Sequence, residues 1–242
     1  MFAIQTKNLT KKYHGLTAVD RLNLEIRQGE LFSLLGLNGA GKTTTVKMLS
    51  CLTRPTDGEA LVGGSNTVSQ SETVKRKIGV SPQETAVAPN LSVEENLELM
   101  CGIYGFSKEK TKKQTQFLSE KLGLQTVLRK KAGTLSGGFQ RRLSIAMALI
   151  GEPEILFLDE PTLGLDVIAR RELWDVIRTL KGKVTVILTT HYMEEAEALS
   201  DSVGIMKNGK LLAVGTPEEL MRQTETDQFE TAFISIVKEA AV

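Results

Sequence analysis

The sequence predicts an α/β fold with a parallel β-sheet at its core, an antiparallel β subdomain at the N-terminal end and an inserted α-helical subdomain. Short continuous apolar runs such as Ile155–Leu158 are typical of strands buried on both faces of a parallel sheet. Residues Leu22–Ile26 instead alternate strictly between apolar and polar, which is typical of a strand with one buried face. Residues 84–150 carry mainly helical signals between strand-rich segments, so we expect them to form the insertion.

Short strands are predicted in the first 35 residues. Ile4–Thr6 and Leu22–Ile26 are the first two, and a break at Gln28–Glu30 separates them from the buried run Leu31–Leu35. Tyr13 lies just before a loop. Its ring could be a partly buried packing group or could stack on a purine base, and sequence spacing alone favours neither.

A glycine-rich segment follows the run Leu31–Leu35 and precedes a predicted helix, Thr44–Leu52. It matches the phosphate-binding pattern G-x-x-x-x-G-K-[ST] in the strand-to-helix context that the pattern requires. The glycines let backbone N–H groups point inward, and the helix adds the positive end of its dipole. Lys42 can place its ammonium between the β- and γ-phosphates of a nucleotide, and the Thr43 hydroxyl can ligate Mg²⁺. The segment therefore predicts a nucleotide phosphate site.

The middle of the chain changes from strands to helices. A turn at Arg54–Gly58 leads to a predicted strand at Glu59–Gly63, and a second short strand at Ile78–Val80 ends at Gln83. Ser92 and Glu95 have the spacing of a capping box, which marks the start of a helix. Helical segments are predicted at Asn96–Tyr104, at Lys108–Gly123 and from Ser136 to Ile150.

Two later strands end in polar side chains. Asp159 and Glu160 close the apolar run before them, and His191 follows the run Val184–Leu188 after an amphipathic helix at Val167–Leu180. Two adjacent carboxylates at the tip of a buried strand are unfavourable without a counter-charge, so we expect a cation beside them. Polar strand tips next to a phosphate loop are where an open parallel sheet builds its binding site.

A hairpin and a helix are the last elements that we predict. Val203–Met206 and Leu211–Val214 form the hairpin around a turn at Asn208-Gly209. Thr216 starts the helix, with proline at the first helical position and glutamate three residues after the cap. Residues 223–242 carry no signal that we could assign.

Composition limits the classes of function. Among 242 residues, 30 Lys and Arg balance 29 Asp and Glu, and this net charge of +1 gives no reason to expect binding to nucleic acid or to an anionic membrane surface. The two cysteines lack metal-ligand spacing, so we expect free thiols in a reducing cytosol. We expect neither a signal peptide nor a membrane-spanning segment, so a membrane role would need another chain as anchor.

The order and spacing of these motifs resemble the ATP-binding cassette (ABC) ATPases over roughly residues 3–222. The specific part is Leu-Ser-Gly-Gly at residues 135–138, upstream of a strand that ends in Asp159-Glu160-Pro161. The runs at residues 161–166 and 190–197 look closest to ATP-binding subunits of ABC-2-type exporters, which include drug, antibiotic-resistance and sodium extrusion systems. The resemblance implies a P-loop NTPase (RecA-like) core in one domain at 1–222, with 84–150 as the helical insertion and 223–242 as an unassigned tail.

The resemblance also implies the ligands of each site, which are ATP and Mg²⁺. Tyr13 would stack on adenine, and the resemblance favours this role over packing alone. Thr43, Gln83 and, through water, Asp159 would hold Mg²⁺, and Gln83 would report the γ-phosphate to the helical insertion. The phosphates would be held by Gly36, Leu37, Asn38, Gly39, Ala40, Gly41, Lys42, Thr43 and Thr44.

Catalytic and interface roles follow from the same resemblance. Glu160 would polarise the attacking water, and His191 would contact the γ-phosphate. Ser136, Gly137 and Gly138 begin a helix whose N–H groups form a second anion site, and the resemblance implies that they and Asp166 face the nucleotide of a partner subunit. The chain would thus form a head-to-tail dimer with ATP.

Two departures from the common family pattern are present. Leu37 replaces the usual proline of the phosphate loop, a change that should be tolerated because its side chain need not touch phosphate. Phe139 separates the double glycine from Gln140, whose role stays open.

The expected function is ATP hydrolysis that powers export through a separate polytopic membrane subunit, at the cytoplasmic face of the membrane. Three alternatives remain: a soluble ABC ATPase that acts on ribosomes, DNA or a protein assembly, a P-loop kinase, and a non-catalytic nucleotide-sensing module.

Overall fold

Residues 1–239 are described by the structure, a computed structural model. Within them, a six-stranded sheet has the order β10-β9-β3-β8-β7-β6, in which β10 is antiparallel to β9 and the other neighbours are parallel. Its strands are β3 (Leu31–Gly36), β6 (Ile78–Ser81), β7 (Ile155–Asp159), β8 (Thr185–Thr190), β9 (Ser202–Lys207) and β10 (Lys210–Gly215). The predicted parallel core is confirmed.

A second, antiparallel sheet lies beside this core in the order β2-β1-β4-β5. It contains β1 (Phe2–Tyr13), β2 (Leu16–Arg27), β4 (Asp57–Val62) and β5 (Ser65–Asn66). The prediction of an N-terminal antiparallel layer is therefore confirmed, but β1 and β2 are each 12 residues long rather than short segments. Their pairing contains register shifts, and Asn8 and Arg21 adopt positive φ. Such irregularities interrupt the two-residue alternation, which is why the sequence predicted only fragments.

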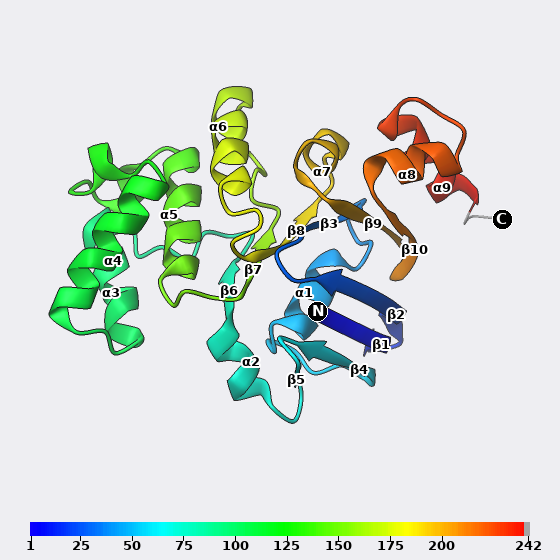
Figure 1. The fold of residues 1–242 in the computed structure, drawn as a ribbon, viewed down its shortest axis with the longest axis horizontal. Helices are drawn as coiled ribbons and strands as arrows, with labels where there is room; N and C mark the ends of the chain where they lie inside the picture. The colour runs from blue at the N-terminus through cyan, green and yellow to red at the C-terminus, as the bar shows by residue number, and fades with distance from the viewer. Residues whose placement is uncertain (240–242) are drawn as a thin grey trace.

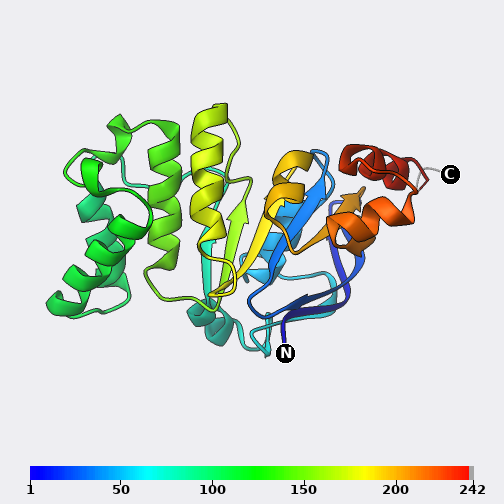
Figure 2. The same ribbon diagram turned by 45° about the horizontal axis from the view of Figure 1, so that its top comes forward.

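Side-chain alternation along the central strands separates two layers of core. Phe32, Ile155 and Phe157 face helix α1 (Lys42–Leu49) and the antiparallel sheet. Leu156 and Leu158 face the opposite side, against α5 (Gly137–Leu149) and α6 (Val167–Arg178). Figures 1 and 2 show α5, α6 and α7 (Met193–Leu199) side by side over this face. The sheet is thus covered on both faces, as the continuous apolar strands require.

A helical block lies at one end of the molecule (Figure 1). It contains α3 (Val93–Ile103), α4 (Lys108–Lys121) and α5, with short 3₁₀ turns at Gln125–Val127 and Ala132–Thr134. The predicted capping box at Ser92 and Glu95 is present, since each residue's side chain accepts a hydrogen bond from the other's backbone N–H. The prediction of helices between residues 84 and 150 is confirmed at these positions.

Helices α8 (Pro217–Gln223) and α9 (Phe229–Glu239) lie at the other end (Figure 2). The cap at Thr216 and Pro217 is as predicted. Phe229 and Phe233 of α9 pack with residues of β3 and β9, so most of the tail that we could not assign joins the core; residues 240–242 lie outside the described part. The sequence also gave no prediction for α2 (Ser71–Lys77) or α7.

Within residues 1–239, no helix combines the length and the apolar character that crossing a membrane requires. Both cysteines are free thiols, as predicted.

Candidate functional site: a nucleotide cleft

The phosphate-binding loop connects β3 to α1 and is fixed by close backbone approaches. A Cβ atom at Gly36 would lie 2.5 Å from the Met206 carbonyl oxygen, and one at Gly41 would lie 2.5 Å from the Ala18 carbonyl oxygen. Gly41 also has φ of 104°, which side chains disfavour. Only glycine therefore fits these two positions.

The turn between β9 and β10 supports the same loop. The backbone N–H of Gly209 donates to the Ala40 carbonyl at 3.0 Å, and the N–H of Asp20 donates to the Gly209 carbonyl at 2.8 Å. The predicted turn at Asn208-Gly209 thus bridges the phosphate loop and β2. This connection fixes the loop between two sheets.

Lys42, at the first position of α1, is buried with 5% of its surface exposed. Its Nζ donates to the Gly36 carbonyl at 2.7 Å and to the Leu37 carbonyl at 3.3 Å. The same Nζ lies 3.1 Å from Glu160 Oε1. The chain itself thus supplies a cation beside one of the two strand-tip carboxylates, Glu160.

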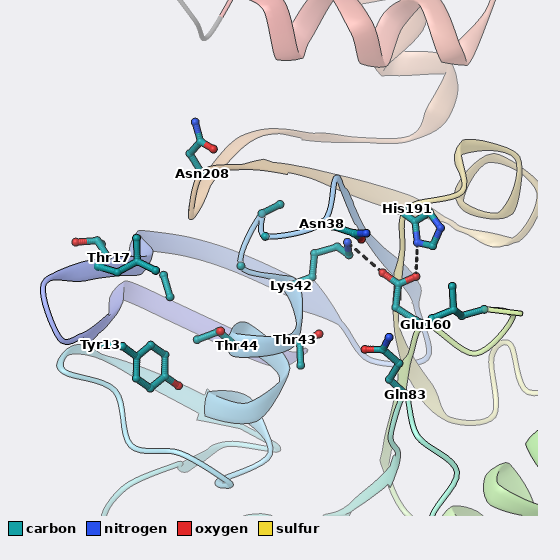
Figure 3. A pocket seen from close by; sticks show the side chains of 16 residues that line it. Tyr13, Thr17, Asn38, Lys42, Thr43, Thr44, Gln83, Glu160, His191 and Asn208 are labelled. Carbon is teal, nitrogen blue, oxygen red and sulfur yellow. Dashed lines mark hydrogen bonds and ion pairs between the residues drawn. The ribbon is translucent and has the colours of Figure 1, made fainter.

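Glu160 uses both of its carboxylate oxygens. Oε1 pairs with Lys42, and Oε2 lies 2.6 Å from Nδ1 of His191, as Figure 3 shows. The residue has φ of 49°, and its backbone N–H donates to the Thr189 hydroxyl at 3.0 Å. The turn after β7 thus directs a buried carboxylate toward the phosphate loop and the tip of β8.

Asp159 lies one residue earlier and points to a different set of partners. Its Oδ1 accepts hydrogen bonds from the hydroxyls of Thr43, at 3.2 Å, and of Thr189, at 2.5 Å. Asp159 is buried, with 5% of its surface exposed. The contact with Thr43 brings together two of the three residues predicted to hold Mg²⁺.

Lys42, Thr43, Glu160 and His191 line a cleft of about 750 Å³ at the carboxyl ends of the parallel strands. Tyr13 lies at the far side of it, half exposed, with the Lys11 ammonium 4.9 Å from the ring centroid. Among the residues predicted to hold phosphate or Mg²⁺, Gly36, the exposed Leu37 and Asp159 do not line the cleft. The lining residues are Tyr13, Leu16, Thr17, Ala18, Asn38, Gly39, Ala40, Gly41, Lys42, Thr43, Thr44, Gln83, Glu160, Leu163, His191 and Asn208.

Oxygen donors at the cleft fit a small hard cation. The Thr43 hydroxyl, the Gln83 amide and the Asp159 carboxylate supply oxygen, which Mg²⁺ prefers. Among residues 1–239, no group of three or more His, Cys, Asp or Glu side chains is placed to hold a metal ion. Mg²⁺ usually retains waters and binds substrate phosphates together with few protein ligands, so the Thr43, Gln83 and Asp159 oxygens fit it.

The signature segment lies apart from this cleft. Ser136 is the N-cap of α5, and Ser136 and Gly137 are exposed. Asp166 caps α6, accepting a hydrogen bond from the Ala169 N–H at 2.9 Å. Within the described chain, the cleft is not lined by Ser136, Gly137, Gly138 or Asp166. Their predicted position opposite a partner's nucleotide remains a prediction.

Several residues of the site were not predicted. Thr17 and Ala18 of β2 and Asn208 of the hairpin turn line the cleft, and Thr189 holds Asp159. The turn signal at Asn208-Gly209 was visible in the sequence, but its position over the phosphate loop depends on how the two sheets pack.

A buried carboxyl group lies on α7, the helix that follows His191 in the chain. Glu195 of α7 is fully buried and accepts a hydrogen bond at Oε1 from Trp174 Nε1 at 2.9 Å. Burial raises its pKa, although the hydrogen bond from Trp174 opposes the rise. The sequence pattern gave no sign that this glutamate, among three in α7, points into the core.

The fold and the cleft define a P-loop nucleotide-binding domain with an ABC-type helical insertion. The chain belongs to the ABC transporter family, whose family model matches residues 19–163.

Named relatives and a solved structure agree with this family assignment. The chain is 41% identical over 240 residues to "Probable multidrug ABC transporter ATP-binding protein YbhF" of Escherichia coli, covering 97% of this chain and 41% of that protein. It is 41% identical over 219 residues to "Daunorubicin/doxorubicin resistance ATP-binding protein DrrA" of Streptomyces peucetius, covering 90% and 66%. The dimeric, post-hydrolysis structure of the ATP-binding cassette MJ0796 with ADP and Pi matches with a TM-score of 0.79 at 29% identity, covering 88% and 98%. This chain thus spans less than half of YbhF and about two thirds of DrrA.

Proposed function

We propose that this chain is the ATP-binding and ATP-hydrolysing subunit of an exporter. The observation that carries the proposal is the buried contact of Glu160 with both Lys42 and His191 at the phosphate loop. Phosphoryl transfer to water needs positioned charges and an oriented water more than covalent chemistry, and these three side chains supply both.

Lys42 and Glu160 would change partners during binding. A γ-phosphate in the cleft would compete for the Lys42 ammonium, which now contacts Glu160 Oε1. Glu160 would then be free to orient a water, while His191 holds its other oxygen and contacts the phosphate from the tip of β8. Mg²⁺, held by Thr43, Gln83 and through water by Asp159, would neutralise charge on the phosphate oxygens.

Tyr13 supports a preference for a purine nucleotide. Its ring lines the cleft on the far side from Glu160 and is exposed enough to be stacked upon. The nine residues Gly36–Thr44 would hold the phosphates between that ring and Glu160. Gly36 and Leu37 would contribute only by setting the backbone path of the loop.

A head-to-tail dimer would complete the site. Ser136, Gly137 and Gly138 present exposed or half-exposed backbone at the N-terminus of the 13-residue helix α5, and Asp166 lies at the N-terminus of α6. A helix N-terminus favours anions, so this segment suits a second copy's nucleotide. The structure of the dimeric cassette MJ0796 supports dimerisation. Residues 1–222 would form one ABC domain, with 84–150 as its helical insertion.

Transport requires a polytopic membrane subunit. The relatives YbhF and DrrA are named for multidrug transport and for daunorubicin and doxorubicin resistance, which supports export as the direction. The surface around Gln83 and the helical block would dock on that subunit at the cytoplasmic face of the membrane. We expect no nucleic-acid partner.

Copurification tests the transport role. The tagged chain would be expressed in its native cell, membranes solubilised in mild detergent, and bound proteins identified by mass spectrometry against cells that carry the tag alone. A polytopic membrane protein is expected. Recovery only with ribosomes or other soluble partners would contradict the transport role, and phosphate transferred to a small molecule instead of water would favour a kinase.

A further inference from the structure

Arg141 joins the signature helix to the loop that carries Gln83. It lies in α5, one helical turn after Gly138, and only 5% of its surface is exposed. Its Nη1 donates to the Pro82 carbonyl and its Nη2 to the Gln83 carbonyl, each at 2.6 Å. A planar guanidinium that binds two successive carbonyls fixes the orientation of the peptide between them, which a flexible ammonium would not do.

A second contact joins the same two elements. The hydroxyls of Ser81, at the end of β6, and Ser144, three residues beyond Arg141, lie 2.8 Å apart and are buried. The loop that directs the Gln83 side chain into the cleft is therefore held at two points by one rigid helix.

The charge of Arg141 is buried without a direct ion pair among the described residues. Burial lowers its pKa, whereas the nearby carboxylates of Asp159 and Glu195 raise it. Arginine keeps its charge in proteins, so the guanidinium depends on the two carbonyls for its hydrogen bonds. Displacement of the Gln83 loop would leave a buried cation with fewer partners, which makes independent movement of loop and helix unfavourable.

We propose that Arg141 is a positioning residue that couples the ligand at Gln83 to the orientation of the signature segment, residues 136–138. The inference rests on the proposed function, because Gln83 then faces the chain's own γ-phosphate and the signature segment faces the partner's nucleotide. Arg141 would thus connect the two sites of the dimer. Coupling of this kind requires that one element respond to both ligands, and α5 with the Gln83 loop is that element.

The test separates nucleotide binding from coupling. In a Glu160→Gln parent, ATP affinity is measured at a protein concentration low enough to keep the chain monomeric, and Mg-ATP-driven dimerisation is measured by analytical ultracentrifugation. Arg141→Gln should bind ATP as the parent does but dimerise about tenfold less tightly, within the usual range of coupling between sites. Arg141→Lys keeps the charge but loses the paired donors, so its dimerisation affinity should lie between those of the Glu160→Gln parent and Arg141→Gln.

Arg142→Gln is the matched control. Arg142 is the next residue of α5 and pairs with Glu172 of α6 instead of reaching the Gln83 loop. The Arg142→Gln variant should dimerise as tightly as the Glu160→Gln parent. If Arg141→Gln does not fold or does not bind ATP, the inference is tested by comparing dimerisation of Arg141→Lys with that of Arg142→Gln.

Three results would overturn the inference. Dimerisation of the Arg141 variants as tight as that of the parent would remove the coupling role while leaving the proposed dimer intact. An equal loss in Arg142→Gln would show that any change in α5 weakens the dimer. A parent that stays monomeric with Mg-ATP would overturn the proposed dimer and the inference together.

Discussion

The ammonium of Lys42 lies 3.1 Å from the Glu160 carboxylate, and both side chains are almost completely buried. Each is assigned to a different step, because Lys42 would bind phosphate and Glu160 would orient water. If Lys42 binds phosphate as proposed, their contact would link phosphate binding to release of the carboxylate.

Removing one partner of this pair should destabilise the protein. Lys42→Met leaves Glu160 with His191 alone, and an unpaired buried charge typically costs about 3–5 kcal/mol. The double variant Lys42→Met/Glu160→Gln removes both charges and should recover much of that loss. Urea unfolding of the parent, both single variants and the double variant measures the effect. Equal stability of Lys42→Met and the parent would argue against a buried ion pair.

Gly41 and Gly39 offer a comparison within the phosphate loop. Both have positive φ, but a Cβ at Gly41 would meet the Ala18 carbonyl at 2.5 Å, whereas one at Gly39 would meet nothing within 4 Å. Gly41→Ala should therefore reduce ATP affinity and lower the melting temperature much more than Gly39→Ala. Calorimetric titration and thermal unfolding would show the difference. Similar effects at both positions would mean that φ alone, rather than contact with β2, sets the requirement.

Tyr13 should contribute to affinity through its ring. Tyr13→Ala should weaken ATP binding about 5- to 150-fold, because stacking of a base on an aromatic ring contributes about 1–3 kcal/mol. Tyr13→Phe should bind as the parent does, since it keeps the ring and loses only the hydroxyl. Fluorescence titration with ATP measures both variants. Equal weakening in Tyr13→Phe would indicate that the hydroxyl, rather than the ring, makes the contact.

Glu195 should make stability depend on pH. Burial raises its folded-state pKa, so the folded protein is favoured when the carboxyl is protonated, and this contribution is lost as pH rises above the ordinary value of 4.5 toward the folded pKa. Glu195→Gln keeps an acceptor for Trp174 and cannot ionise. Its stability relative to the parent should therefore increase with pH above 4.5, measured by urea unfolding across a pH series. Two charged groups interact electrostatically with Glu195: Glu160, which raises its pKa further, and Arg141. Both residues are present in the parent and in Glu195→Gln. A constant difference at all pH values would contradict the prediction.

The sequence predicted the elements whose signals are local. The phosphate loop, the apolar strand before Asp159 and the caps at Ser92 and Thr216 depend on a few neighbouring residues, and all four were found where predicted. The sequence did not reveal contacts that depend on packing. Arg141 was one basic residue among several on a predicted helix, and only the position of α5 against β6 brings it to the Gln83 carbonyl. Asn208 and Ala18 likewise reach the cleft only because the hairpin and β2 pack against the phosphate loop.

The measurement that tests the account most directly is release of free phosphate from Mg-ATP by the copurified complex, carrying either the parent chain or Glu160→Gln. We expect the variant to bind ATP and to lose turnover by about 10²–10⁴-fold, the usual contribution of a positioned general base. Near-normal turnover by Glu160→Gln would contradict the assignment of the water-orienting carboxylate and, with it, the mechanism built on the contact between Lys42 and Glu160.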